Sequence, residues 1–244
     1  MRSTRVYLDA PMAVAMRVTL PEPVVAHLVR VLRLGVGDGF VLFNGDGGDY
    51  RARLVSVGKK SAEAELLDRV EPGNESPLRI TLAQGIARGE KMDLILQKAT
   101  ELGVACIAPV LTERTEVKLD GERLEKKLQH WRGVLAAACE QSGRARLPQL
   151  LEPQTLANFA AGEHSAGRYI LDPEAGRTLA SLDVGGHDSI CLLIGPEGGL
   201  SDRDRAAVRT AGFEGLRLGP RILRTETAGL AAIAALNALF GDWR

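Results

Sequence analysis

The sequence predicts an α/β protein in which a parallel sheet with helices follows a small β-barrel or sheet domain. From Leu78 onward, short apolar runs alternate with segments of helical periodicity, which is the pattern of a parallel sheet. Residues 1–72 instead contain short apolar runs separated by turn signals. Between them lies EPGNESP at 71–77, whose proline, glycine and charges are typical of a linker. We therefore expect a first domain at 1–72, a linker at 73–77 and a second domain at 78–244.

The first domain is expected to combine short strands with one helix. The stretch NGDGG at 44–48 lies between the runs FVLF and YRARLVSV, so its expected role is a hairpin loop. The helix is expected from Glu22 to about Leu32. Arg30 and Arg33 lie near its end, where positive charge favours the helix dipole. The expected strands are Arg5–Leu8, Ala13–Leu20, Gly39–Phe43, Tyr50–Val57 and Ala62–Leu67.

The second domain begins with alternating strands and helices. Its first helix has apolar residues at helical spacing, which predicts one buried face. These residues are Met92, Ile95, Leu96, Ala99 and Leu102. The expected elements are a strand at Leu78–Ala83, a helix at Glu90–Leu102 ended by Gly103, a strand at Val104–Leu111, a helix from about Gly121 to Ser142, a helix at Pro153–Ala161 and a strand at Arg168–Asp172.

Two glycine- and proline-rich loops dominate the remaining part of the chain. The run SICLLI at 189–194 is nearly all apolar, as in a strand covered on both faces, and the loop GPEGG at 195–199 ends it. A second strand at 214–218 leads into the loop LGPRILRTETAG at 218–229. The alanine-rich run Ala228–Leu239 then predicts a last helix.

A helix is expected between these two loops. Ser201 can cap its first turn, Asp204 stands three residues later as a capping-box partner, and Gly212 lies where a helix ends.

Loops at the carboxyl ends of neighbouring strands are where open α/β sheets bind ligands. Glycine lets backbone N–H and C=O groups approach a ligand closely, because it has no Cβ. A side chain at Gly195 or Gly198 is therefore expected to intrude on a bound ligand while leaving the fold intact. The alternative is that both loops are simple tight turns.

IGPEGG, a capped helix and LGPRILRTETA at this spacing resemble the signature of the SPOUT RNA methyltransferases. Within that group the chain resembles the RsmE family of 16S ribosomal RNA uracil-N3 methyltransferases. The segment HLVRVLRLGVGD at 27–38 resembles the start of a PUA-like RNA-binding domain. The resemblance implies a trefoil-knotted parallel sheet of the SPOUT type, preceded by a small PUA-like β-barrel domain. It also implies an S-adenosylmethionine cofactor between the loops and 16S rRNA as the partner, within an assembled or assembling small ribosomal subunit.

The resemblance assigns cofactor-binding residues to the two loops and to the end of a third strand. They are Leu171, Asp172, Pro173, Ile194, Gly195, Pro196, Glu197, Gly198, Gly199, Leu218, Gly219, Leu223, Arg224, Thr225 and Thr227. Asp204 stands where the family pattern has glutamate, and we expect that difference to matter only to helix capping.

Methyl transfer to uracil N3 requires loss of a proton and stabilisation of charge on the flanking carbonyl oxygens. Arg224 is the candidate for stabilising that charge, and Glu226 is a candidate base or orienting group. The alternative for Glu226 is a carboxylate favoured by the dipole of a first helical turn. The family motifs also suggest that Glu140 faces the target uracil.

The cations and amides of the other motifs are candidates for contacts with RNA. They are Arg30, Arg33, Arg88, Lys91, Lys98, Gln141 and Arg144. Lys98 has an alternative role, because Glu101 lies three residues further along the same predicted helix and can form an ordinary ion pair with it.

Composition narrows the remaining possibilities. Residues 1–151 carry 22 basic and 19 acidic residues and residues 152–244 carry 9 and 12, so a nucleic-acid surface toward the front is allowed. The 3 cysteines and 4 histidines are scattered, so we expect neither a disulfide framework nor a metal site. No apolar run approaches the ~20 residues of a membrane helix, and we expect a cytoplasmic protein.

The last predicted helix is apolar on every side, and such a helix needs cover all round. It is either a central core helix or, as the resemblance favours, part of a homodimer interface. The rival functions are methylation of a ribose 2′-hydroxyl on the same fold and non-catalytic RNA binding during ribosome assembly.

Overall fold

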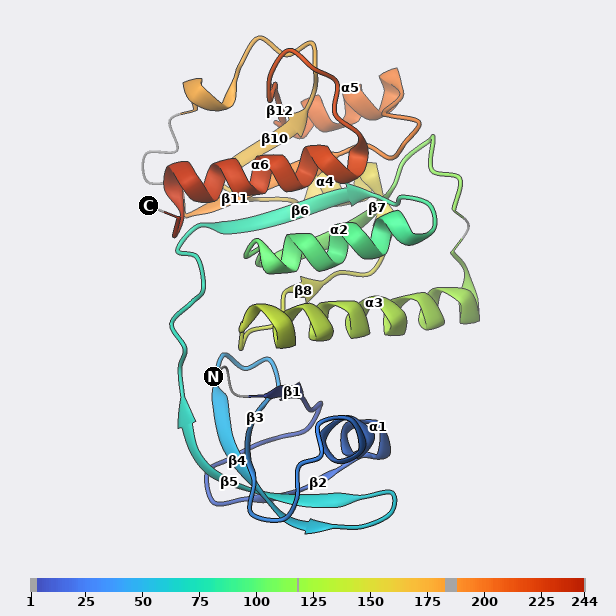
Figure 1. The fold of residues 1–244 in the computed structure, drawn as a ribbon. Coiled ribbons are helices and arrows are strands. Elements are labelled where there is room, and N and C mark those ends of the chain that lie inside the picture. Colours follow the sequence, from blue (N-terminus) through green and yellow to red (C-terminus); the bar gives the residue numbers. More distant parts are fainter. Residues whose placement is uncertain (1–3, 118, 183–187, 244) are drawn as a thin grey trace. The chain divides into compact units, whose positions relative to one another are not determined.

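The structure is a computed structural model that describes residues 4–117, 119–182 and 188–243 (Figure 1). The chain forms two compact units, one of Met1–Asn74 with Cys139–Leu147 and one of Glu75–Ala138 with Pro148–Arg244. The segment Cys139–Leu147 thus groups with the N-terminal unit, although the sequence places it in the second domain. The domain limits 1–72, 73–77 and 78–244 stay a prediction.

The N-terminal unit contains a sheet with the strand order β1-β3-β4-β5-β2. β1 pairs with β3 in parallel, and the other neighbours are antiparallel. The strands are β1 (Arg5–Tyr7), β2 (Arg17–Leu20), β3 (Gly39–Phe43), β4 (Asp49–Val57) and β5 (Ala62–Val70). The expected hairpin loop at 44–48 connects β3 and β4, which pair antiparallel as predicted.

The helix expected from Glu22 to Leu32 forms as α1 (Glu22–Val25) followed by a π-helical segment, η1 (Ala26–Val31). The helical segment ends at Val31, and Arg33, two residues further on, has a φ of +60° in the left-handed region and turns the chain away. Leu28 is fully buried against the sheet. The apolar face therefore anchors the helix, whereas Arg30 and Arg33 are exposed.

The second unit contains a parallel sheet with the strand order β12-β10-β11-β6-β7-β8, and β9 also pairs with β7. The strands are β6 (Arg79–Gly85), β7 (Cys106–Leu111), β8 (Gln149–Leu150), β9 (Gln154–Thr155), β10 (Gly167–Leu171), β11 (Ser189–Ile194) and β12 (Glu214–Leu216). The parallel α/β sheet predicted from the alternating pattern is confirmed. The trefoil knot stays a prediction.

Helices cover both faces of this sheet, with α2 and α6 on one face and α4 and α5 on the other (Figure 1). Their bounds are α2 (Glu90–Glu101), α3 (Gly121–Ser142), α4 (Leu156–Gly162), α5 (Asp202–Thr210) and α6 (Thr225–Phe240), with a short 3₁₀ turn, η2 (Leu179–Ser181). β11 lies where the predicted apolar run lies. Its Ile190, Leu192 and Ile194 pack on the α2 and α6 side, whereas Cys191 and Leu193 pack on the α4 and α5 side.

Two helix starts differ from the expectation for local reasons. α4 begins at Leu156 rather than Pro153, because Gln154 and Thr155 pair with β7 and the Thr155 hydroxyl caps the helix by accepting the Asn158 N–H. α6 begins at Thr225, so the polar residues before Ala228 form its first turn.

The predicted capping box of α5 is confirmed between Ser201 and Asp204. The expectation that Asp204 matters only to capping is wrong, because its carboxylate also accepts the backbone N–H of Glu113 at 3.3 Å. Asp204 therefore links α5 to the segment that follows β7.

α6 buries one face and leaves another open. Gly229, Ala232, Ile233 and Leu236 are buried, whereas the small or apolar residues Ala231, Ala238 and Leu239 are exposed. Asn237 is the polar exception on the buried face. Its Nδ2 donates to the Leu102 carbonyl at 2.7 Å, and its Oδ1 accepts the Ser76 hydroxyl at 2.9 Å.

Asn237→Leu should destabilise the second unit by about 1–3 kcal/mol, because the carbonyl of Leu102 would lose its partner in the interior. Ser76→Ala removes only one of the two hydrogen bonds and should cost less. Urea unfolding measures both changes. An Asn237→Leu variant as stable as the unaltered protein would contradict this account of α6.

Candidate functional site

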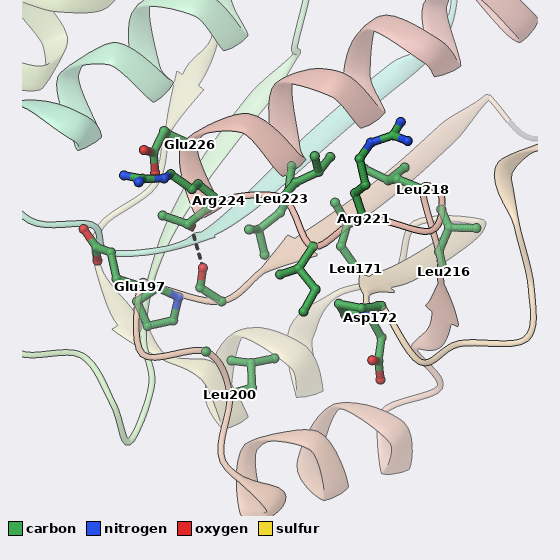
Figure 2. Close-up of a pocket in the computed structure, with 18 of the residues that line it drawn as sticks. Leu171, Asp172, Glu197, Leu200, Leu216, Leu218, Arg221, Leu223, Arg224 and Glu226 are labelled. Carbon is green, nitrogen blue, oxygen red and sulfur yellow. Dashed lines mark hydrogen bonds between the residues drawn. The ribbon is translucent and has the colours of Figure 1, made fainter.

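A cavity of about 520 Å³ lies at the carboxyl ends of β10, β11 and β12 (Figure 2). Its size is within the range of small-molecule sites. Three loops and the start of α6 supply most of the wall, at the sheet edge where α/β folds bind ligands. The lining residues are Lys91, Leu171, Asp172, Pro173, Ile194, Gly195, Pro196, Glu197, Gly199, Leu200, Arg205, Leu216, Leu218, Gly219, Arg221, Ile222, Leu223, Arg224, Thr225, Glu226 and Ala228.

One hydroxyl joins the two glycine-rich loops. Thr225, the first residue of α6, donates its hydroxyl to the Gly195 carbonyl at 2.6 Å and accepts the Nε2–H of Gln84 at 2.9 Å. Gln84 lies on β6 and is fully buried. The strand β6, the loop after β11 and the start of α6 are therefore held together at one point.

The GPEGG loop closes as a tight turn. The N–H of Gly199 donates to the Pro196 carbonyl at 2.8 Å, and Gly199 has a φ of +69°, which favours glycine. A Cβ on Gly195 would lie 3.1 Å from Leu200 Cγ and 3.2 Å from the Gly199 backbone. A side chain at Gly195 would therefore press on the turn itself, and the expectation that it spares the fold stays a prediction.

Asp172 anchors the end of β10. Its backbone N–H donates to the Leu216 carbonyl at 3.0 Å, and its carboxylate accepts the Arg205 guanidinium at 2.7 Å. The carboxylate is buried and Arg205 is partly exposed. This ion pair fixes the first turn of α5 against the third loop.

A second group of charges lies at the other end of the cavity. Figure 2 shows Glu197, Arg224 and Glu226 on one side, with Leu171 and Leu223 between them and Asp172. The ammonium of Lys91 lies 3.3 Å from Glu197 Oε1 and 3.9 Å from Glu226 Oε2. The cavity therefore has a leucine-rich middle and charged ends.

The electrostatics of Glu197 follow from its neighbours. Burial disfavours the charged form, but the backbone N–H groups of Glu197 and Arg88 and the ammonium of Lys91 outweigh it, so the pKa of Glu197 is lowered from its ordinary value of 4.5. Glu197 is therefore an anion at neutral pH. Its carboxylate ties the GPEGG loop to the segment that leads into α2.

Most predicted cofactor-binding residues meet in this cavity. Among the described residues, Gly198 and Thr227 are the predicted ones that do not line it. A Cβ on Gly198 would meet the Arg114 side chain at 3.2 Å, outside the cavity. The expectation that a side chain at Gly198 intrudes on a ligand stays a prediction.

The three candidate catalytic residues do not all lie at the cavity. Arg224 and Glu226 line the cavity. Glu140 is not among the described lining residues, and its carboxylate accepts the backbone N–H of Tyr7 at 2.7 Å. A catalytic role for Glu140 stays a prediction.

The candidate RNA contacts are spread over the chain. Arg30 donates to the Lys59 carbonyl at 3.2 Å, Arg88 pairs with Glu116, and Lys98 pairs with Glu101 at 2.8 Å. Arg33 and Gln141 are exposed, whereas Arg144 is buried. Lys91 lies at the cavity. The RNA-binding roles stay predictions.

The sequence reasoning missed several lining residues. Arg221, Ile222 and Ala228 belong to the second loop and its helix, so the motif itself could have indicated them. Leu200 and Leu216 adjoin predicted residues. Arg205 had no local signal, because its place at the cavity depends on how α5 packs.

The described part of the chain offers little for other chemistry. No three His, Cys, Asp or Glu side chains gather there as a metal site. Burial raises the pKa of Cys106 to about 11 and that of Cys191 well above its ordinary value, so neither thiol is a ready nucleophile. Among residues 4–117, 119–182 and 188–243, no helix combines the length and apolarity needed to span a bilayer.

Two family models match the chain. One is described as an RNA methyltransferase domain and covers residues 74–237, and the other is described as an RNA methyltransferase PUA domain and covers residues 20–67. The chain belongs to this RNA methyltransferase family. Its N-terminal unit is accordingly PUA-like, as the resemblance implied.

Members of this RNA methyltransferase family include close relatives over most of the chain. Ribosomal RNA small subunit methyltransferase E of Synechocystis sp. is 38% identical over 91% of this chain and 73% of its own length. The protein of that name from Buchnera aphidicola subsp. Schizaphis graminum is 31% identical over 99% and 98%.

Two solved structures of the family are also similar. A methyltransferase of Legionella pneumophila in complex with SAM is 39% identical, with a TM-score of 0.94 over 99% of this chain and 100% of that chain. The Neisseria gonorrhoeae ribosomal RNA small subunit methyltransferase E bound to S-adenosyl methionine is 39% identical, with a TM-score of 0.91 over 100% of both chains.

Thr225→Val should destabilise the folded second unit by about 1–3 kcal/mol, because the Gly195 carbonyl would lose its buried donor. Thr225→Ser keeps the hydroxyl and should recover most of that loss. Urea unfolding of both variants measures the difference. Equal stability of the valine and serine variants would contradict a joining role for the hydroxyl.

Lys91→Met should raise the pKa of Glu197, because the ammonium that favours the carboxylate is removed. In the unaltered protein, ionised Glu197 stabilises the fold above pH 4.5, and this contribution is lost as the pH falls through the lowered pKa. In the variant this contribution should be smaller, and its loss should be complete at a higher pH. Carbon NMR of the Glu197 carboxyl measures the titration, and an unchanged midpoint would refute the assignment.

Proposed function

We propose that this chain transfers a methyl group from S-adenosylmethionine to N3 of a uridine in 16S ribosomal RNA. The main support is the cavity at the ends of β10, β11 and β12, where the loops that carry the family signature converge. The family relatives are named for methylation of small-subunit ribosomal RNA. Two similar structures of the family contain S-adenosylmethionine.

The residues of the cavity fit this cofactor. Leu171, Leu218 and Leu223 supply an apolar wall that would hold a planar ring, and the glycine-rich loops expose backbone groups to its polar edges. The lining also carries the carboxylates of Asp172, Glu197 and Glu226, of which Asp172 pairs with Arg205 and Glu197 with Lys91. When bound, the cofactor supplies an electrophilic methyl group on a sulfonium sulfur.

The protein's own residues have to accept the N3 proton of uracil and stabilise the charge that develops on its oxygens. N3 carries a proton at neutral pH, and negative charge spreads onto the flanking oxygens as that proton leaves. We assign Arg224 to these oxygens, because its guanidinium is exposed at the cavity and carries a fixed positive charge. We assign Glu226 to N3–H, because a carboxylate accepts such a proton.

RNA binding would involve the scattered cations as well. Arg30, Arg33 and the amide of Gln141 are exposed, and side chains of these types hydrogen-bond to phosphate oxygens. If its substrate is ribosomal RNA, the protein acts in the cytoplasm, on an assembled or assembling small subunit. No metal takes part in this proposal.

A homodimer would cover the open face of α6. Ala231 and Ala238 are small enough to allow close approach of a second helix, and Leu239 adds exposed apolar area. The family resemblance favours this interface.

Ala228→Phe should weaken S-adenosylmethionine binding roughly 10- to 100-fold, because the ring would occupy part of the cavity. Transfer of a labelled methyl group to small ribosomal subunits should fall in parallel at low cofactor. Ala206→Phe on the exposed side of α5 is the matched control and should leave both unchanged. Full activity of Ala228→Phe would place the cofactor elsewhere.

Light scattering should give a mass of about twice 26.2 kDa at micromolar concentration. Ala231→Lys with Ala238→Lys should shift the protein toward the monomer, because two buried lysines at the interface are costly. A monomeric unaltered protein would refute the dimer.

A further inference from the structure

The position of Lys91 differs from that expected of a lysine that contacts RNA phosphates. It belongs to the first turn of α2, and its ammonium lies between two carboxylates that come from other segments, at 3.3 Å from Glu197 and 3.9 Å from Glu226. A cation that already faces two anions offers little net charge to a phosphate. Its place indicates a role inside the cavity.

The carboxylate of Glu226, beside Lys91, has one oxygen without a hydrogen bond. Its Oε2 is buried, and it has no hydrogen-bond partner among the described residues. The Lys91 ammonium lies just beyond hydrogen-bond distance of it. A buried carboxylate oxygen of this kind is costly unless a donor reaches it, so the site favours a ligand that brings an N–H group.

We propose that Lys91 is a positioning residue for methyl transfer, which holds the carboxylates of Glu197 and Glu226 so that Glu226 receives the N3 proton of the target uracil. The inference rests on the proposed function and deepens it. Uracil N3–H is a donor of the required kind. Glu197 secures the other side of Lys91, because it also accepts the backbone N–H of Arg88.

The step balances without a further reactant. The N3 electron pair forms the new bond to the methyl carbon, the bond from that carbon to sulfur breaks, and its electron pair stays on sulfur. The N3 proton passes to Glu226 and later to solvent. Lys91 neither gains nor loses a bond in this step, and its part is to hold the carboxylate that accepts the proton.

The charged groups around Glu226 are few in the described chain. Lys91 on α2 lies 3.9 Å from its Oε2, and Glu197 and Arg224 lie on the same side of the cavity as Glu226 (Figure 2). The effect of Lys91 is therefore separable from that of Arg224, which we assign to the uracil oxygens.

The test compares single-turnover methylation of small ribosomal subunits by the unaltered protein, Lys91→Met and Lys91→Arg at saturating S-adenosylmethionine. Lys91→Met should lower the rate constant by about 10- to 100-fold, because Glu226 would no longer be held for the proton transfer. Cofactor and RNA affinities should stay within about twofold. Lys91→Arg should recover much of the rate. Lys126→Met, an exposed lysine on α3, is the matched control.

A double-mutant comparison distinguishes the positioning role from a general loss of folding in Lys91→Met. In a Glu226→Gln background the further change Lys91→Met should have no added effect on the rate constant, because both residues act on one proton transfer. Additive effects would overturn the proposal.

Other outcomes separate the rival roles. A normal rate constant with weaker RNA binding and a smaller salt slope would make Lys91 a phosphate contact. A loss of cofactor affinity that matches the loss of rate would make it a structural support of the loop. If the unaltered protein forms no 3-methyluridine, the proposed function fails and the inference fails with it. If the unaltered protein and Lys91→Met both form 3-methyluridine at the same rate, the inference alone fails.

Discussion

The candidate site depends on the hydroxyl of Thr225. It links Gln84 of β6, the Gly195 carbonyl after β11 and the first turn of α6, and these segments are far apart in the sequence. Each loop alone is a turn that many proteins contain. Held at one point, the two loops line one cavity. The positions of Arg224, which directly precedes α6, and of Glu226 in its first turn follow from the same link.

The parallel sheet provides the frame for that link. β11 packs on both faces, with alternate residues in two separate cores, so its end is fixed in space. β10 and β12 lie beside it in order, and all of them run in one direction. Their carboxyl ends therefore meet at one edge, where short loops can present backbone groups and a few charges to a ligand.

The sequence predicted the elements best where local chemistry decides them. The apolar run at 189–194 and the capping box of Ser201 and Asp204 are examples, since each needs only its neighbours. It predicted most of the cavity because the two motifs lie in the loops that line it. Arg205 and Lys91 could not be assigned to the cavity in this way, because their places depend on the packing of α5 and α2. Gly195 shows the same limit, since the atoms that a side chain would meet belong to its own turn.

The chemical nature of the product tests the account most directly. Small ribosomal subunits from cells that lack this protein can be methylated by the purified protein with labelled S-adenosylmethionine, and the nucleosides can be separated by mass spectrometry. The account predicts label in 3-methyluridine, with the methyl group on the base. Label in a 2′-O-methylated ribose would contradict it, because Arg224 and Glu226 would then serve a different acceptor.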